Sequence, residues 1–243
     1  MLEIEPVTVN ILARNSFMKQ PRKRFGKPLK VFGIVLIIAG LGVLLYIPAT
    51  WVMGYFAQRG LPAEFDQESA SALSLNQSVL GKMQGAAETE KIRELAKAFQ
   101  KQLHSEQTIA RLEIPRIGIN AIVVEGTADS SLRKGVGHME DTPLPGMREN
   151  FSLAGDRVLY GAPFLNIDDL SEGDDIHVKT TYAEFNYTVV SKKITTPDDT
   201  AILNSPGFEA VTLITCDPPW DTSHRLVVQG KMTSASLLNS GTN

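Results

Sequence analysis

The first part of the chain is dominated by one long apolar run. From Val31 to Gln58 no residue is charged, and Val31–Ile47 (VFGIVLIIAGLGVLLYI) is apolar almost throughout. Because about 20 helical residues cross the hydrocarbon core of a bilayer, residues 31–53 are predicted to form a transmembrane helix. A cleaved signal peptide is the alternative, but this run is longer than a signal core and begins well inside the chain.

The segment after the apolar run, residues 54–108, is predicted to be a helical spacer. Residues 57–87 are rich in Ala, Ser, Gly and Gln and indicate only a weak helical tendency. Within Glu88–Leu103 the apolar residues recur at helical spacing, which predicts an amphipathic helix. Packing against a protein core is the favoured use of its apolar face, and contact with a bilayer surface is the minor alternative.

From residue 109 the pattern changes to short apolar runs separated by Pro, Gly and Asp. The candidate strands are Ile109–Ile114, Ile119–Val124, Phe151–Ala154, Asp175–Thr180, Phe185–Ser191, Val211–Thr215 and Arg225–Lys231. Many short strands with turn residues between them and little helix are typical of a barrel or sandwich. Residues 109–232 are therefore predicted to form one all-β domain, followed by a tail of residues 233–243.

The distribution of charge predicts the orientation in the membrane. Residues 1–30 carry seven lysines and arginines against two glutamates. Because cationic flanks stay on the cytoplasmic side, this basic tail is predicted to be cytoplasmic. Everything after about residue 57 then lies outside, in a single-pass protein of the cell membrane. The net charge of −3 and the lack of a basic stripe argue against nucleic-acid binding.

The only cysteine, Cys216, ends the apolar run VTLIT and precedes Pro218–Pro219, which prevent a central strand from continuing. A lone cysteine is usually a small buried residue, but outside the cytoplasm an unpaired thiol is a candidate reactive group. If the last two strands pair antiparallel, Arg225 lies near Cys216, where its guanidinium favours the thiolate and can bind an oxyanion. The alternative for Arg225 is a surface ion pair. The alternative for Thr215 is an ordinary strand residue without a role in the site.

The sequence gives no sign of a cofactor or a metal site. It contains no Gly-rich phosphate loop after a strand, and its four histidines, at positions 104, 138, 177 and 224, are scattered. Zinc ligation is therefore not expected, and no cluster of carboxylates resembles a calcium loop.

These residues resemble the sortases, membrane-anchored cysteine transpeptidases of the bacterial cell surface. TLITC at residues 212–216, followed nine residues later by Arg-Leu-Val-Val, is the signature of that family. Other matching segments are ARLEIPRIGI (110–119), VEG (124–126), GHMEDTPLPG (137–146), LAGDR (153–157), GAPF (161–164) and Leu170 with Gly173–Asp174. The resemblance covers roughly residues 109–232 and implies an eight-stranded β-barrel.

The resemblance also implies a two-step reaction on surface proteins that carry a C-terminal sorting signal. Cys216 would cleave an LPXTG-like signal and form a thioacyl-enzyme. An amine from a cell-wall precursor or a pilin lysine would then resolve it. Arg225 would bind the substrate and stabilise the oxyanion, and Thr215 is assigned to substrate binding. Nothing resembles a long lid segment, which slightly favours general anchoring over pilus assembly.

One position departs from the family pattern. Ala-Gly-Asp-Arg at residues 154–157 places Asp156 where the family has its catalytic histidine. That histidine is expected to protonate the departing amine, and its cation favours the thiolate. An aspartate is normally ionised at neutral pH and has no proton to donate, its charge disfavours a neighbouring thiolate, and it could pair with Arg225. Three other histidines are not expected to replace the catalytic histidine: His138, His177 and His224.

Four interpretations follow for this substitution and this site. The favoured one is a sortase whose rate is reduced about 10²- to 10⁴-fold by the loss of a general acid and base. The alternative is an inactive sortase-like module that binds sorting signals. A third would use Asp156 as a base or an orienting group. The least favoured is a structural membrane-surface protein, which would have no reactive thiol at Cys216.

Overall fold

The structure, a computed structural model, describes residues 27–238. Most of the predicted basic tail and the last five residues of the predicted C-terminal tail lie outside the described residues. The helices are α1 (Lys27–Lys82), α2 (Glu88–Gln100) and α3 (Asp129–Leu132), with three short 3-10 turns, η1 (Pro115–Ile117), η2 (Ile167–Asp169) and η3 (Thr200–Leu203). The strands are β1 (Thr108–Ile114), β2 (Ile119–Glu125), β3 (Val136–His138), β4 (Asn150–Ala154), β5 (Asp175–Thr180), β6 (Ala183–Thr195), β7 (Ala210–Asp217) and β8 (His224–Leu237).

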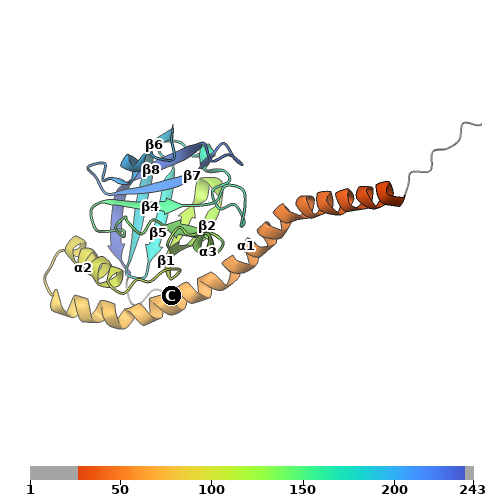
Figure 1. The fold of residues 1–243 in the computed structure, drawn as a ribbon. Coiled ribbons are helices and arrows are strands. Elements are labelled where there is room, and N and C mark those ends of the chain that lie inside the picture. Colours follow the sequence, from red (N-terminus) through yellow and green to blue (C-terminus); the bar gives the residue numbers. More distant parts are fainter. Residues whose placement is uncertain (1–26, 239–243) are drawn as a thin grey trace, which may run out of the picture. The chain divides into compact units, whose positions relative to one another are not determined.

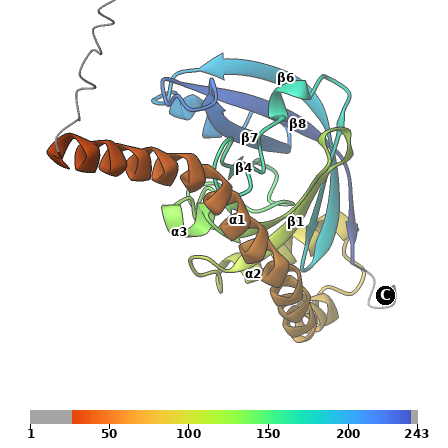
Figure 2. The same cartoon turned by 90° about the vertical axis from the view of Figure 1, so that its right-hand side faces the viewer.

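The eight strands form a closed barrel in the order β1-β2-β3-β4-β7-β8-β6-β5 (Figures 1 and 2). The predicted eight-stranded β-barrel is confirmed. Two neighbouring pairs, β2 with β3 and β4 with β7, are parallel, and the other pairs are antiparallel. Closure pairs both edges of every strand, so the ends of the strands and the loops that join them remain for binding and chemistry.

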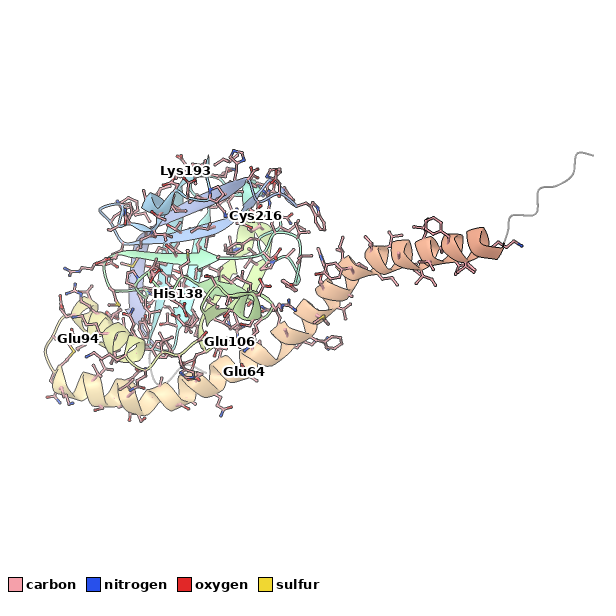
Figure 3. The ribbon with its side chains drawn as sticks, viewed as in Figure 1. Glu64, Glu94, Glu106, His138, Lys193 and Cys216 are labelled. Carbon is pink, nitrogen blue, oxygen red and sulfur yellow. The ribbon has the colours of Figure 1, made fainter. Side chains whose placement is uncertain are left out.

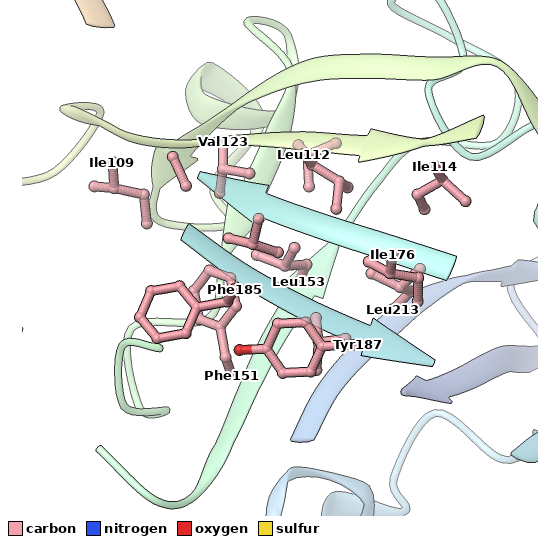
Figure 4. Packing of buried hydrophobic residues seen from close by; sticks show 14 of the residues in the cluster. Ile109, Leu112, Ile114, Val123, Phe151, Leu153, Ile176, Phe185, Tyr187 and Leu213 are labelled. Carbon is pink, nitrogen blue, oxygen red and sulfur yellow. The ribbon is translucent and has the colours of Figure 1, made fainter. Parts of the chain in front are cut away.

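The barrel interior is filled by apolar side chains. Large buried residues point inward from almost every strand, as Figure 4 shows for Ile109, Leu112, Ile114, Val123, Phe151, Leu153, Ile176, Phe185, Tyr187 and Leu213. The helix α2 adds Ile92, Leu95 and Phe99 to the same cluster. Its predicted apolar face therefore packs on the core, as expected.

The helix α1 extends further than the sequence indicated. The described residues divide into two units between Val43 and Leu44, and α1 begins in the first and ends in the second. In the first unit the described apolar side chains are exposed, and α1 is long and apolar enough to cross a membrane by length and composition. The spacer predicted to be weakly helical is helical up to Lys82.

Tertiary packing explains why the second part of α1 is a helix. Leu61 and Phe65 form a small buried cluster with Ile122 and Val124 of β2. Further along, the Asn76 side-chain amide donates to the carbonyl of a barrel loop at a distance of 3.0 Å. In proteins such contacts stabilise a helix more than the propensity of its residues does, so a composition rich in Ser and Gly did not prevent it.

Candidate active site

The nucleophile candidate and its arginine are direct neighbours in the β-sheet. Cys216 on β7 is the register partner of Arg225 on β8, and Nη1 of the guanidinium lies 3.6 Å from Sγ. The same Nη1 donates to the carbonyls of Thr222 and His224, at 3.1 and 3.0 Å. Within residues 27–238 this guanidinium makes its hydrogen bonds through Nη1 alone, so the other N–H groups can reach a ligand.

The loop between these two strands contains internal hydrogen bonds. Asp221 accepts a hydrogen bond from the backbone N–H of Ser223 at 2.9 Å, and this bond lowers the pKa of the Asp221 carboxyl below its usual range. Trp220 has a left-handed backbone, with φ of 72°, and is 66% exposed. Left-handed backbone is unusual for a bulky residue and is common in functional loops. The loop that joins the strands of the Cys–Arg pair thus holds an aromatic ring in solvent.

Position 156 lies at the same rim of the barrel as the thiol. The parallel strands β4 and β7 pair Ala154 with Ile214. Asp156 follows two residues after Ala154, beyond the end of β4, and Cys216 two residues after Ile214 on β7. The hydroxyl of Thr215 donates to the carbonyl of Gly155 at 2.8 Å and is buried. This bond fastens the two strand ends, and the substrate contact expected for Thr215 stays a prediction.

The Asp156 side chain closes a turn. Its Oδ1 accepts the backbone N–H groups of Val158 and Leu159, at 2.8 and 2.7 Å. The ion pair considered between Asp156 and Arg225 is not found among the described residues. Asp156 thus lies two residues beyond the last β4–β7 pair, as Cys216 does, and one of its carboxyl oxygens is already engaged by its own loop.

A buried arginine supports this rim from within the protein. Arg157 is 4% exposed and forms ion pairs with Asp217 at 2.6 Å and Asp168 at 2.8 Å. Its Nη1 also lies 3.4 Å from the carbonyl oxygen of Cys216. Its ion-pair partners are therefore these two carboxylates and not the adjacent Asp156. Sequence analysis missed this role because an arginine after a strand gives no sign that it is buried.

Among the described residues, His138, His177 and His224 do not take the place of the histidine expected at position 156. His138 is buried, with Nδ1 2.7 Å from Oε2 of Glu125 and Nε2 3.1 Å from Oγ1 of Thr142; Figure 3 labels His138 and Cys216. His177 is half-buried in β5, and His224 is exposed at the start of β8. In the described part of the chain none of the three bonds to the Cys216 thiol. Residues 27–238 also contain no group of three or more His, Cys, Asp or Glu that could hold a metal ion.

Comparison with known proteins decides the family. The sortase domain family matches residues 112–233, the part of the chain that forms the barrel and carries the Cys–Arg pair. The chain belongs to the sortase family. The sortase signature at residues 212–216 therefore corresponds to the end of β7, where the thiol meets Arg225.

Individual sortases are similar over the same region. Sortase D of Bacillus subtilis is 35% identical over 124 residues, which is 49% of this chain and 61% of that protein. Sortase A of Bacillus anthracis is 29% identical over 140 residues, which is 57% of this chain and 66% of that protein. The solved sortase D5 transpeptidase of Clostridium perfringens has a TM-score of 0.53 and 30% identity, and the match covers 66% of this chain and 99% of that structure. The chain thus spans less than two thirds of each of the two curated relatives.

Proposed function

We propose that this protein is a sortase-type cysteine transpeptidase of the cell membrane. The proposal rests on one observation above all, the 3.6 Å contact between Cys216 Sγ and Arg225 Nη1 at the rim of a sortase-family barrel. A cation beside a thiol favours the thiolate. Guanidinium N–H groups can also stabilise the oxyanion that forms during acyl transfer.

The proposed reaction has two steps. The Cys216 thiolate attacks the carbonyl carbon of a peptide bond in an LPXTG-like sorting signal of a surface protein. The carbon–nitrogen bond breaks, the departing amine takes up a proton, and a thioester remains on Sγ. A second amine, from a cell-wall precursor or a pilin lysine, then attacks the thioester, loses a proton to water, forms a new amide and releases the thiolate.

Asp156 limits the proposed reaction at the proton transfer. Its Oδ1 already accepts two backbone N–H bonds, and an aspartate is normally ionised at neutral pH, so in this proposal water protonates the departing amine. Loss of a general acid and base costs about 10²- to 10⁴-fold in rate, and we propose a slow transpeptidase. The second candidate is a module that binds sorting signals without cleaving them, and the engaged carboxylate of Asp156 favours it.

A mass spectrum of the full chain in detergent micelles, after mixing with an LPXTG-type peptide, separates these candidates. We expect a thioacyl adduct on Cys216 that accumulates over hours. Cys216→Ala is the control, and it should bind the peptide but form no adduct. Binding of the peptide with no adduct at any time would favour the module, and failure of both binding and adduct formation would contradict both candidates.

Arg225 provides a further prediction. In the Asp156→His background, Arg225→Lys is expected to slow adduct formation about 10²- to 10³-fold, the usual cost of losing one oxyanion donor. Lysine keeps the charge but lacks the planar fork of N–H groups. Stopped reactions resolved by mass spectrometry measure the rate, and Lys231→Arg on the same strand is the matched control. A rate within threefold of the parent would exclude an oxyanion role for Arg225.

The proposed location follows from the apolar part of α1. Residues 31–53 would cross the membrane, with the N-terminus in the cytoplasm and the barrel outside, where surface proteins and wall precursors meet. The absence of charge from Val31 to Gln58 supports the span. The cationic residues before it support the orientation.

A further inference from the structure

The loop between β4 and β5 is attached to the part of α1 that follows the apolar run. The indole Nε1 of Trp51 donates to the carbonyl of Val158 at 2.8 Å. At Gly54 an added Cβ would lie 2.3 Å from the carbonyl carbon of Tyr160, so helix and loop backbones touch there and only glycine fits. The contacted loop residues closely follow Asp156, whose side chain accepts the N–H of the same Val158.

The contacted part of α1 is where a membrane span would reach the outer interface. Trp51 and Tyr55 are exposed in the second unit, and the uncharged run ends at Gln58. Trp and Tyr are enriched at the boundary between hydrocarbon and headgroups. A loop that bonds to the Trp51 indole therefore lies at the level of that boundary.

The loop itself is suited to an apolar environment. Residues 158–165 (VLYGAPFL) contain no charged side chain, and Leu165 is 38% exposed. Tyr160 and Ala162, on either side of Gly161, have left-handed backbones with φ of 52° and 45°. Such conformations cost of order 1–3 kcal/mol each and persist where surrounding contacts impose them. Packing against α1 provides such contacts.

Together these elements enclose a hollow, which we call the interfacial hollow. Six of its lining residues are Trp51 and Tyr55 of α1, Ile117 of η1, and Tyr160, Pro163 and Leu165 of the loop. The lining is mainly apolar, and within residues 27–238 no charged side chain contributes to it. An apolar, uncharged hollow beside the end of a membrane span matches the acyl chain of a lipid.

We propose that the interfacial hollow binds an acyl chain of a membrane phospholipid, so that the β4–β5 loop rests in the outer bilayer interface. This inference rests on the proposed membrane span of residues 31–53. It adds that the bilayer contacts the loop that holds position 156. The lipid surface would thus border the active site as well as anchor the protein.

The test uses single-cysteine forms of the full chain in nanodiscs, in the Cys216→Ala background. Leu165→Cys is labelled with a small environment-sensitive fluorophore, and quenching is measured with phospholipids brominated along the acyl chain. Leu73→Cys is the matched control, because it is an exposed leucine 22 residues beyond Trp51 on the same helix. At 1.5 Å per residue this is about 33 Å along the helix axis.

We expect brominated lipids to quench the label at position 165 by at least half and to leave the label at position 73 unchanged. Leu45→Cys, inside the apolar run, reports insertion of the span itself. Quenching at 45 without quenching at 165 would overturn the interfacial hollow and leave the anchor intact. Failure to quench at position 45 would overturn both proposals, since the membrane anchor would then be absent.

Discussion

The substitution Asp156→His is expected to increase the rate of thioacyl formation on Cys216 about 10²- to 10⁴-fold, the range that a positioned general acid and base contributes. Position 156 is two residues beyond the last pair of β4 and β7, and so is Cys216. A histidine there can protonate the departing amine, and its cation favours the thiolate. The measurement is the rate of adduct formation by mass spectrometry with an LPXTG-type peptide.

The control for this prediction is Asp156→Asn. The asparagine oxygen can still accept the N–H groups of Val158 and Leu159, as Asp156 does at 2.8 and 2.7 Å, but the side chain carries no charge and no acidic proton. We expect little gain from this variant. An equal gain from Asn and His would show that removing a negative charge is sufficient, and would contradict a proton-transfer role at this position.

The substitution Asp156→His should also lower the free energy of unfolding. Replacing an oxygen that caps backbone N–H groups commonly costs about 0.5–2 kcal/mol. Turnover at low temperature should therefore rise while the melting temperature falls by a few degrees, which circular dichroism of the same samples can record. A gain in activity with no loss of stability would mean that the turn after position 156 does not depend on the carboxylate.

The second large effect is expected at Arg157. Replacing it by glutamine should lower the free energy of unfolding by about 3 kcal/mol, because removing one partner of a buried ion pair costs about 3–5 kcal/mol. We take the lower end because Asp168 is partly exposed. Arg157 pairs with Asp217 and Asp168 and lies 3.4 Å from the Cys216 carbonyl. For a chain of this size about 3 kcal/mol corresponds to roughly 6–12 °C in melting temperature.

Arg148→Gln is the matched control for Arg157. Arg148 also faces two carboxylates, Glu90 at 3.5 Å and Glu209 at 3.9 Å, but its side chain is 58% exposed. Exposed ion pairs contribute only about 0–1 kcal/mol. Thermal unfolding of both variants in the same detergent compares them directly, and equal losses would show that burial of Arg157 has no special effect.

The sequence predicted most strands because alternation and turn residues mark them well. The strand Asp175–Thr180 was predicted with the bounds that β5 has, whereas β3 was missed, since three residues are too short to show a period. The end of β7 at Asp217 and the proximity of Cys216 to Arg225 both followed from local reasoning about prolines and antiparallel pairing.

Other features depend on contacts between distant parts of the chain and could not be predicted in this way. The helix α1 continues to Lys82 because Leu61 and Phe65 pack on β2. Likewise, the hydroxyl of Thr215 and the guanidinium of Arg157 find their partners across the β4–β7 pair and on η2. In each case the residue type was visible in the sequence, but its partner was not.

The direct sheet pairing of Cys216 with Arg225 has a consequence for how this protein can change. Because Asp217 also pairs with His224, the two strands are in register up to the point where the chain leaves the barrel. The spacing of the Cys216 and Arg225 backbones is therefore set by the strand pairing, and residues 218–223 add one contact, the Thr222 carbonyl that accepts from Nη1 of Arg225 at 3.1 Å. Insertions or exchanges in residues 218–221, before Thr222, can remodel what approaches the thiol while the strand pairing keeps Cys216 and Arg225 opposite each other, which makes this segment a natural point for diversification and for grafting new specificities.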